Sequence, residues 1–332
     1  MKDRHRTGPA PKVSIVTPLF NSSPYIEKTL DSVLAQTEGN WESILVDDGS
    51  TDNTPQKIEP YLKDRRFAYI RQDNKGIAGA RNTGIRAAVG EWVCLLDHDD
   101  RWMPTKLERQ LAFASEQKLD LLGTDAVVIK ADTRTLYSRT RFSNFLEKLR
   151  GSLDDASIDL FELLIQGNFL CSSSVMIRKS FFDRLGLLDE AAAPADDYEM
   201  WLRCMPEAKI GFLDEPLIEY HLHEHNYSRN RFMMAEKEIY ALKKTYAGFK
   251  GIRKQRDELE QRISQLSGIT ARACLDEYHR VAQNGLLSDA LTFLRQALSL
   301  APSEVLMPRR FAAALKRGVL SAFGVRGAHV KS

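Results

Sequence analysis

Three carboxylates and an imidazole directly follow an apolar run in the segment CLLDHDDRWM, residues 94–103. Asp97, His98, Asp99 and Asp100 offer the hard ligands that suit Mg²⁺ or Mn²⁺, the ions that bridge diphosphates. Like charges repel one another at the end of what should be a buried strand, and a bound cation would relieve that repulsion. Alternatively, the segment is a solvated loop whose first aspartate caps the next helix.

A second aspartate pair, Asp47 and Asp48, ends another apolar run, and Phe20 follows a third. A carboxylate can accept a hydrogen bond from the imide N–H of uracil, so Asp48 is a candidate for base recognition. Phe20 could stack on that base. The alternatives are an Asx-type turn at Asp48 and core packing of Phe20.

Arg81 lies in a glycine-rich helical segment that begins near Gly76. A guanidinium group suits bidentate phosphate recognition, and helix N-termini favour anions. Arg81 is therefore a candidate contact for a diphosphate, although an ordinary surface arginine would fit the same pattern.

Two adjacent aspartates, Asp196 and Asp197, open a helical pattern in DDYEMWLRC. We interpret Asp197 as a general base that takes the proton of an acceptor hydroxyl. The N-terminus of a helix should keep its carboxylate ionised, as a base requires. The alternative is a helix-capping carboxylate.

Three histidines, His221, His223 and His225, alternate after a strand-like stretch, which places them on one face. They lie too close along the chain for a closed tetrahedral zinc site. We expect one of them to reach a diphosphate or its metal instead.

Alternating strands and helices must position these residues. Strand-like stretches occupy residues 13–19, 42–47, 67–71, 91–96 and 119–129, and helical patterns occupy residues 23–36, 54 onward, 76–90 and 103–117. This alternation predicts βαβ units and a largely parallel sheet. Ligands of such sheets bind beyond the carboxyl ends of the strands, where the polar clusters at 17–21, 47–52 and 97–100 fall.

The second half of the chain changes character near residue 230. Before it we expect helices at 158–166, 179–185 and 196–204, and strands at 172–177, 209–213 and 217–221. Beyond it the pattern is helical, interrupted at Gly268, with a hairpin turn at Asn284-Gly285. The predicted organisation is a flexible tail (1–11), an α/β domain (12–230) and a helical appendage (231–332).

Composition fits a globular protein, with 43% hydrophobic and 28% charged residues among 332. A net charge of +2 provides no reason to expect nucleic acid as a partner. The four cysteines are widely spaced, which indicates reduced thiols rather than disulfides or zinc. The polar N-terminal residues and the lack of an apolar run of 18 residues predict a cytoplasmic protein without a secretory signal.

Four motifs, taken together and in this order, resemble the family 2 inverting glycosyltransferases of GT-A fold. They are VSIVTPLFNSSPYIEKTLDSVLAQT, ILVDDGSTDNT, NKGIAGARNTGIRAAVGEWVCLLDHDD and DDYEMWLR, and the match runs from about Lys12 to His225. The resemblance implies a Rossmann-like, mixed and mostly parallel sheet flanked by helices. It also implies inverting transfer of a sugar from a nucleotide-sugar, usually UDP-linked, to a hydroxyl of a glycan or lipid-linked acceptor.

Site residues carry over from the family by position. The resemblance implies that the nucleotide-sugar is held by Thr17, Pro18, Phe20, Asp48, Arg81 and Asp97. The DxD motif would be Asp97 with Asp99, and Asp99 and His223 would lie at a Mn²⁺ or Mg²⁺ ion. Asp197 would be the catalytic base, and the preceding acid of the family's Glu-Asp pair is Asp196 here.

The QxxRW signature of processive synthases is missing, as are their membrane helices. The expected enzyme is therefore a non-processive hexosyltransferase of cell-surface polysaccharide biosynthesis. A nucleotidyltransferase would be expected to carry a Gly-rich basic loop after the first strand, which TPLFNSSPYI is not. The remaining alternative is a catalytically retired GT-A domain that serves as a scaffold through its helical appendage.

The C-terminal segment from Arg309 to Lys331 is basic, with no acidic residue and with Phe311, Leu315 and Phe323 on one candidate apolar face. Such a segment could lie on the inner face of an anionic membrane. Alternatively, it packs on its own domain or forms a homodimer with a second subunit.

Overall fold

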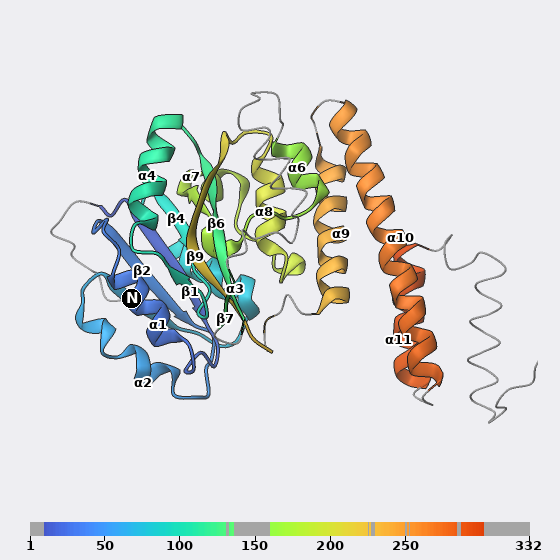
Figure 1. The fold of residues 1–332 in the computed structure, drawn as a ribbon, viewed down its shortest axis with the longest axis horizontal. Helices are drawn as coiled ribbons and strands as arrows, with labels where there is room; N and C mark the ends of the chain where they lie inside the picture. Colours follow the sequence, from blue (N-terminus) through green and yellow to red (C-terminus); the bar gives the residue numbers. More distant parts are fainter. Residues whose placement is uncertain are drawn as a thin grey trace, which may run out of the picture. The chain divides into compact units, whose positions relative to one another are not determined.

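The computed structural model describes residues 10–130, 133–135, 160–224, 226, 230–249, 251, 253–283 and 287–301. The chain divides into two compact units, Met1–Arg229 and Asn230–Ser332 (Figure 1). The first unit contains the candidate site residues, and each unit is described by itself below.

The described strands of the first unit form one mixed sheet in the order β3-β2-β1-β4-β8-β6-β9-β5, with β7 paired to β6. The half β3-β2-β1-β4 is parallel, whereas β8 runs antiparallel to both β4 and β6. The strands are β1 (Val13–Leu19), β2 (Trp41–Asp47), β3 (Phe67–Arg71), β4 (Trp92–Leu95), β5 (Arg101–Trp102), β6 (Leu121–Lys130), β7 (Thr133–Thr135), β8 (Met176–Arg178) and β9 (Ile210–Leu222).

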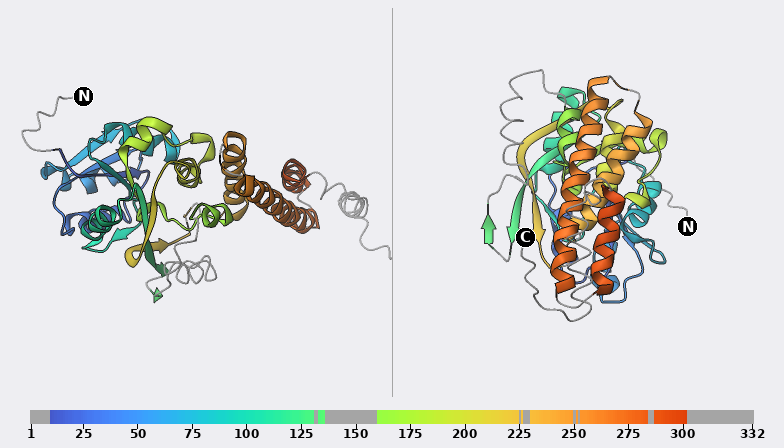
Figure 2. Two further views of the ribbon diagram at one scale, coloured as in Figure 1. Left: turned by 90° about the horizontal axis from the view of Figure 1, so that it is seen from above. Right: turned by 90° about the vertical axis from the view of Figure 1, so that its right-hand side faces the viewer.

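Helices cover both faces of this sheet (Figures 1 and 2). They are α1 (Ile26–Leu34), α2 (Thr54–Ile58), α3 (Gly76–Ala87), α4 (Lys106–Gln117), α6 (Leu160–Gln166), α7 (Lys179–Leu185) and α8 (Asp196–Cys204). Short 3₁₀ turns lie at η1 (Tyr61–Lys63), η2 (Ser172–Ser174) and η3 (Glu190–Ala192).

The residues of β1 show how the two layers meet the sheet. All seven are buried, and alternate ones such as Ile15 join a core cluster with α1 and α4 that includes Leu30 and Leu107. On the other face α3 packs so closely that a Cβ added to Gly84 would lie 2.3 Å from Val16 Cγ1. This approach holds α3, which carries Arg81, against the centre of the sheet.

The second unit contains α9 (Arg231–Gly248), α10 (Arg253–Gln283) and α11 (Leu287–Leu300). A small cluster centred on Ala271, Cys274 and Ala297 packs α10 against α11. No helix in the described parts of the chain is long and apolar enough to cross a membrane. The basic segment beyond Arg309, the turn at Asn284-Gly285 and most of the tail 1–11 lie outside the described residues.

Several predicted elements differ from the structure. The two strands predicted at 209–213 and 217–221 are one strand, β9, whose pairing with β6 shifts register near Asp125, so Pro216 does not end it. Gly268 does not interrupt α10, and the break falls instead between Gly248 and Arg253. Residues 172–174 form a 3₁₀ turn rather than the start of a strand.

Candidate active site at the carboxyl ends of the strands

The acidic segment after β4 directs its carboxylates to different partners. Asp97 Oδ1 lies 2.6 Å from Nη2 of Arg81. Asp99 Oδ2 lies 2.7 Å from Nε2 of His223, a residue 124 positions further along the chain. Asp100 is fully buried. The segment is therefore not a solvated loop, because each aspartate has a defined environment.

The third carboxylate of the segment, Asp100, has a structural role. It is fully buried and accepts hydrogen bonds from Ser173 Oγ at 2.6 Å and from the backbone N–H of His221 at 3.1 Å. Burial, together with the charges of Asp99 and Asp97, raises its pKa well above the ordinary value. Ser173 Oγ also accepts a bond from the Asp97 N–H at 3.1 Å, so this hydroxyl fixes both ends of the segment.

Arg81 joins the acidic segment to the aspartate pair that begins α8. Its Nη1 lies 2.9 Å from Asp196 Oδ2, while its Nη2 is bonded to Asp97. The guanidinium is buried, with only 3% of the side chain exposed. Burial lowers its pKa, but the surrounding carboxylates outweigh burial and raise it, so Arg81 is always charged. Arg81 is therefore not an ordinary surface arginine, and its expected contact with a diphosphate stays a prediction.

Asp197 lies in the first turn of α8, next to this ion pair. The N-cap of the helix is Ala195, so neither aspartate of the pair is the N-cap residue. Asp197 Oδ1 accepts hydrogen bonds from the N–H of Tyr198 at 2.6 Å and from Asn168 Nδ2 at 3.5 Å. Burial, and then the charge of Asp196, raise its pKa to about 7. The sequence predicts that the N-terminus of the helix keeps Asp197 ionised. Burial has the larger effect on its pKa, so Asp197 is not fully ionised at neutral pH.

The candidate base-binding residues lie on loops after β1 and β2. Asp48 is buried, and its Oδ1 accepts hydrogen bonds from Gln72 Nε2 at 2.7 Å and from the Lys75 N–H at 2.9 Å. Phe20 is 46% exposed, which excludes the alternative that it packs in the core. The ring is thus available to a planar ligand, and the Asp48 carboxylate has a fixed orientation.

Thr17 and Pro18, which the resemblance assigns to binding of the nucleotide-sugar, belong to β1 itself. Both are buried in the strand, in register with Leu45 and Val46 of β2. In the described structure Thr17 Oγ1 is a buried atom with no hydrogen-bond partner. A buried hydroxyl without a partner is unusual, and it lies near the edge where a ligand is expected.

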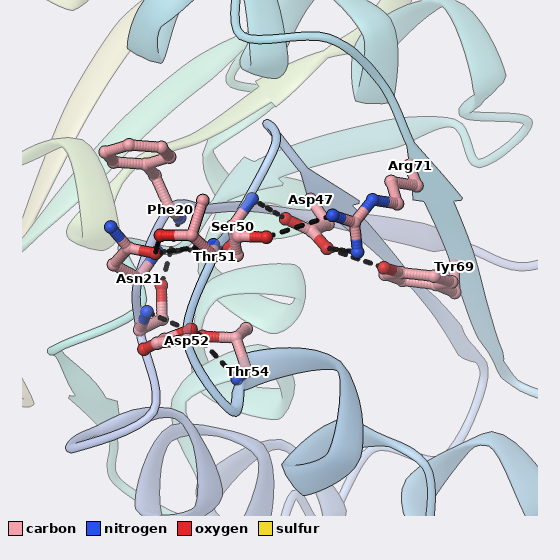
Figure 3. A network of polar contacts seen from close by, with 10 residues as sticks. Phe20, Asn21, Asp47, Ser50, Thr51, Asp52, Thr54, Tyr69 and Arg71 are labelled. Atoms are coloured by element: carbon pink, nitrogen blue, oxygen red, sulfur yellow. Dashed lines mark hydrogen bonds and ion pairs between the residues drawn. The ribbon is translucent and has the colours of Figure 1, made fainter.

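A network of polar contacts cross-links the loops after β1 and β2 (Figure 3). Asn21, whose φ of 50° is left-handed, donates its N–H to Ser50 Oγ at 3.1 Å and accepts the N–H of Thr51 at 2.9 Å. Buried Asp47 accepts bonds from the Ser50 N–H at 2.8 Å and from Tyr69 Oη at 2.6 Å. These bonds hold the loops that carry Phe20 and Asp48 in one arrangement.

His223 follows β9, and its ring is held on two sides. It bonds Asp99, and it stacks on Tyr25 with ring centroids 4.6 Å apart and planes inclined by 11°. Burial acts to raise the pKa of Asp99, but the bond with His223 and the nearby charge of His98 outweigh it and lower the pKa. His225 lies outside the described residues.

The chemistry of these donors fits a divalent metal, although the described residues contain no group of three or more His, Cys, Asp or Glu side chains that could hold one. Asp99 supplies one hard oxygen and His223 one imidazole nitrogen, and these two atoms lie 2.7 Å apart. An ion that is bridged by phosphates needs only one or two protein carboxylates, because phosphate oxygens and water complete its coordination. The chemistry of the pair is compatible with a metal that arrives with a diphosphate.

The geometry brings the predicted residues to one edge of the sheet. Asp48 follows β2 and Asp99 follows β4, and both strands lie beside β1 and run parallel to it. Arg81 connects the segment after β4 to the pair Asp196-Asp197. Sequence reasoning missed Ser173 and Tyr25. Their partners lie at least 70 positions away along the chain, and no local pattern marks such contacts.

The sequence pattern of the family described as "Glycosyl transferase family 2" matches residues 14–186 of this chain. These residues contain β1 to α7 and all but two of the predicted site residues; Asp197 and His223 lie beyond the match.

Curated relatives match about two thirds of the chain. A putative teichuronic acid biosynthesis glycosyltransferase, TuaG of Bacillus subtilis, is 31% identical over 230 residues, which cover 68% of this chain and 85% of TuaG. The Escherichia coli protein WfgD, named as a UDP-Glc:alpha-D-GlcNAc-diphosphoundecaprenol beta-1,3-glucosyltransferase, is 28% identical over 66% of this chain and 81% of its own length. An uncharacterized glycosyltransferase of Rickettsia typhi is 30% identical, and the alignment spans 65% of its length.

Solved structures share the fold at low sequence identity. S. aureus TarS 1–349 in complex with UDP-GlcNAc has a TM-score of 0.63 at 19% identity, over 95% of this chain and 90% of that one. The mannosyltransferase PcManGT from Pyrobaculum calidifontis, in complex with GDP-Man and Mn²⁺, has a TM-score of 0.60 at 17% identity, over 96% of this chain and 89% of that one. The predicted GT-A fold class, a mixed sheet flanked by helices with a helical C-terminal part, is confirmed.

Proposed function

The chain belongs to glycosyl transferase family 2, and on that premise we propose that it transfers a single sugar from a nucleotide-sugar to a hydroxyl group, with inversion at the anomeric carbon. One observation carries the proposal. Arg81 binds Asp97 on one side and Asp196 on the other, and so brings the acidic segment at the sheet edge next to the pair that contains a buried aspartate with a pKa of about 7.

The nucleotide would bind where the loops after β1 and β2 meet. We propose that Phe20 stacks on the base and that Asp48 accepts the imide N–H of uracil. The exposure of the Phe20 ring and the two bonds that orient Asp48 support this assignment. Thr17 and Pro18 would line the nucleoside, and Asp97 would face the sugar-diphosphate end with Arg81 behind it.

Asp197 would act as the general base in a single displacement. The acceptor oxygen attacks the anomeric carbon, its proton passes to Asp197, and the bond to the diphosphate breaks, so that a nucleoside diphosphate leaves. A base with a pKa near 7 matches the usual requirement, because about half of it is deprotonated at neutral pH and that form accepts a proton readily. One in-line attack inverts the configuration without a covalent sugar–protein intermediate.

Asp99 and His223 would hold a Mn²⁺ or Mg²⁺ ion, which neutralises charge on the leaving diphosphate when it is bound. The neighbour PcManGT was solved with Mn²⁺ and a nucleotide-sugar, which supports this choice of ions. The two side chains bond each other. This bond keeps both side chains at the edge where the diphosphate is expected.

The names of the relatives support a choice of acceptor class. TuaG is named for teichuronic acid biosynthesis and WfgD for a diphosphoundecaprenol-linked acceptor. We propose a role in cell-surface glycan assembly with a glycan or lipid-linked acceptor. The location at the inner membrane face depends on the segment beyond Arg309, and a homodimer would form through the helical appendage (231–332). Both stay predictions.

The test is a screen of UDP- and GDP-linked sugars against the full chain, with and without Mn²⁺. Calorimetry measures binding, and release of the free nucleoside diphosphate measures slow hydrolysis without an acceptor. We expect Mn²⁺-dependent binding of at least one UDP-sugar. Binding of no nucleotide-sugar would contradict the proposal and would favour the alternative of a retired enzyme that acts as a scaffold.

A further inference from the structure

Arg81 occupies an environment that a diphosphate ligand would not require. Both of its terminal nitrogens already bond carboxylates, Asp97 Oδ1 at 2.6 Å and Asp196 Oδ2 at 2.9 Å. Only 3% of its side chain is exposed, and its Nε is a buried atom without a partner in the described structure. A group that must meet an incoming ligand is seldom covered so completely.

The two carboxylates that Arg81 binds come from distant parts of the chain. Asp97 follows β4 on the donor side of the proposed site, whereas Asp196 is the residue before the proposed base and begins α8. Asp196 is fully buried, and its Oδ2 is bonded to Arg81. Without the guanidinium, two acidic chain segments would approach each other in the interior with no cation between them.

The charged groups around Asp197 act on it in opposite directions. Burial and the negative charge of Asp196 raise its pKa, Arg81 lowers it, and Asp97 also raises it. Its uncharged neighbours are Asn168, which lies after α6, and the N–H of Tyr198. Arg81 is thus the cation that opposes two neighbouring carboxylates at this position.

We propose that Arg81 is a positioning residue, which ties the donor-side aspartate Asp97 to the pair Asp196-Asp197 and thereby fixes both the place and the proton affinity of the proposed base. It acts through these carboxylates and makes no contact with the diphosphate. The inference rests on the proposed function, because it assigns a role to Arg81 within the same site.

The experiment follows the protonation of Asp197 directly, in full-length protein labelled with ¹³C at the aspartate carboxyl carbons. The Asp197 resonance is assigned by its loss in Asp197→Asn and then titrated by NMR. We expect Arg81→Lys to move the titration to higher pH, since a single ammonium group cannot bind both carboxylates. We expect Asp196→Asn to move it to lower pH, since the like charge is removed. Neighbouring charges shift carboxyl pKa values by about one to three units.

The matched control is Arg86→Lys on the exposed side of the same helix, which should leave the titration unchanged. Arg81→Met is the stronger variant, but its buried uncompensated carboxylates could prevent folding, so the conclusion rests on Arg81→Lys and Asp196→Asn. Shifts in opposite directions support the proposal. No shift, or shifts in the same direction, would overturn it.

Calorimetry with UDP and Mn²⁺ separates this inference from the proposed function. We expect Arg81→Lys to bind UDP within about twofold of the unaltered chain. A loss of tenfold or more would show a direct diphosphate contact and would overturn the positioning role. If the unaltered chain binds no nucleotide while the two titrations shift as expected, the proposed function fails. The role of Arg81 in tying Asp97 to the pair Asp196-Asp197 is then still supported.

Discussion

Asp197 has a carboxyl group that is still partly protonated at neutral pH, because burial and Asp196 raise its pKa to about 7. If Asp197 is the base, only its deprotonated form is active, and kcat/KM for transfer should rise about tenfold per pH unit below pH 7 and level off above it. Asp197→Asn should reduce transfer by about 10²–10⁴-fold while nucleotide binding remains. A rate that is flat between pH 5.5 and 8 in the unaltered protein would contradict this role.

Phe20 is a second residue whose role can be measured by itself. Phe20→Ala should weaken UDP binding by up to about tenfold, because an aromatic stack contributes ~0.5–1.5 kcal/mol beyond the area it buries. Leu62→Ala is the control, since Leu62 is also an exposed apolar side chain, 36% accessible against 46% for Phe20. Equal UDP affinities for Phe20→Ala, Leu62→Ala and the unaltered chain, measured by calorimetry, would remove Phe20 from the base site.

At the level of single residues the sequence indicated which side chains to examine but not how they are paired. The motif does not give the partners of its three aspartates: Asp97 binds Arg81, Asp99 binds His223, and Asp100 is buried against Ser173. Each of these partners lies on another element, so the pairing depends on tertiary packing. The same dependence explains the unexpected pKa of Asp197, which local helix geometry alone would keep low.

At the level of elements, the position of α3 depends on a glycine. Gly84→Ala would place a methyl group 2.3 Å from Val16 Cγ1 on β1. Alanine normally favours a helix over glycine by ~1 kcal/mol, but we expect the clash to reverse the sign and to destabilise the protein by about 1–3 kcal/mol. Urea denaturation measures the change.

Gly39→Ala is the matched control for Gly84→Ala, because no atom lies within 4 Å of the added Cβ at Gly39. It should leave the unfolding midpoint nearly unchanged. The double change Gly84→Ala and Val16→Ala should cost less than the sum of the two single changes, because the methyl group added at residue 84 fills space that Val16 leaves. An unaltered or raised midpoint for Gly84→Ala alone would show that α3 can move away from β1 at little cost.

Elements with a clear hydrophobic pattern in the sequence were predicted well. Elements whose bounds depend on pairing with a neighbouring strand were not. The strand Val13–Leu19 and the strand Phe67–Arg71 follow from runs of apolar and β-branched residues with turn signals at their ends. β9 could not be predicted as one strand, because Pro216 reads as a breaker while a register shift opposite Asp125 accommodates it. Similarly, Gly268 is tolerated inside the 31-residue helix α10.

At the scale of the whole molecule, the chain combines a unit that carries the candidate site with a second unit of packed helices. The edge at which the site lies could be predicted, because polar clusters after β1, β2 and β4 must meet in a parallel arrangement. The resemblance assigns Asp197 of α8 to the same site, but its contact with the end of β4 could not be predicted, because no pairing rule relates a helix that begins near residue 196 to the end of a strand near residue 95. The buried guanidinium of Arg81 makes that connection.

The raised pKa of Asp197 has a consequence for the stability of the whole protein. The unfolded chain titrates this carboxyl near 3.8 and the folded chain near 7, so between these values the folded state holds more of the proton. The contribution of this group to the free energy of unfolding must therefore fall as pH rises from about 4 to about 7, since the unfolded state then releases the proton more readily. A difference of about three pKa units corresponds to up to ~4 kcal/mol for this group.

Asp197→Asn removes this titration and keeps the shape of the side chain. Relative to the unaltered protein, the variant should gain stability with rising pH, with a small difference near pH 4 and a gain of up to ~4 kcal/mol at pH 8. Urea denaturation at several pH values measures this, and Asp183→Asn on the surface of α7 is a control that should show no such trend. A difference that does not grow between pH 4 and pH 8 would show that Asp197 is ionised at little cost. If Asp197→Asn is more stable than the unaltered protein at pH 8 and has lost sugar transfer, the fold tolerates a destabilising carboxyl group because the reaction needs it.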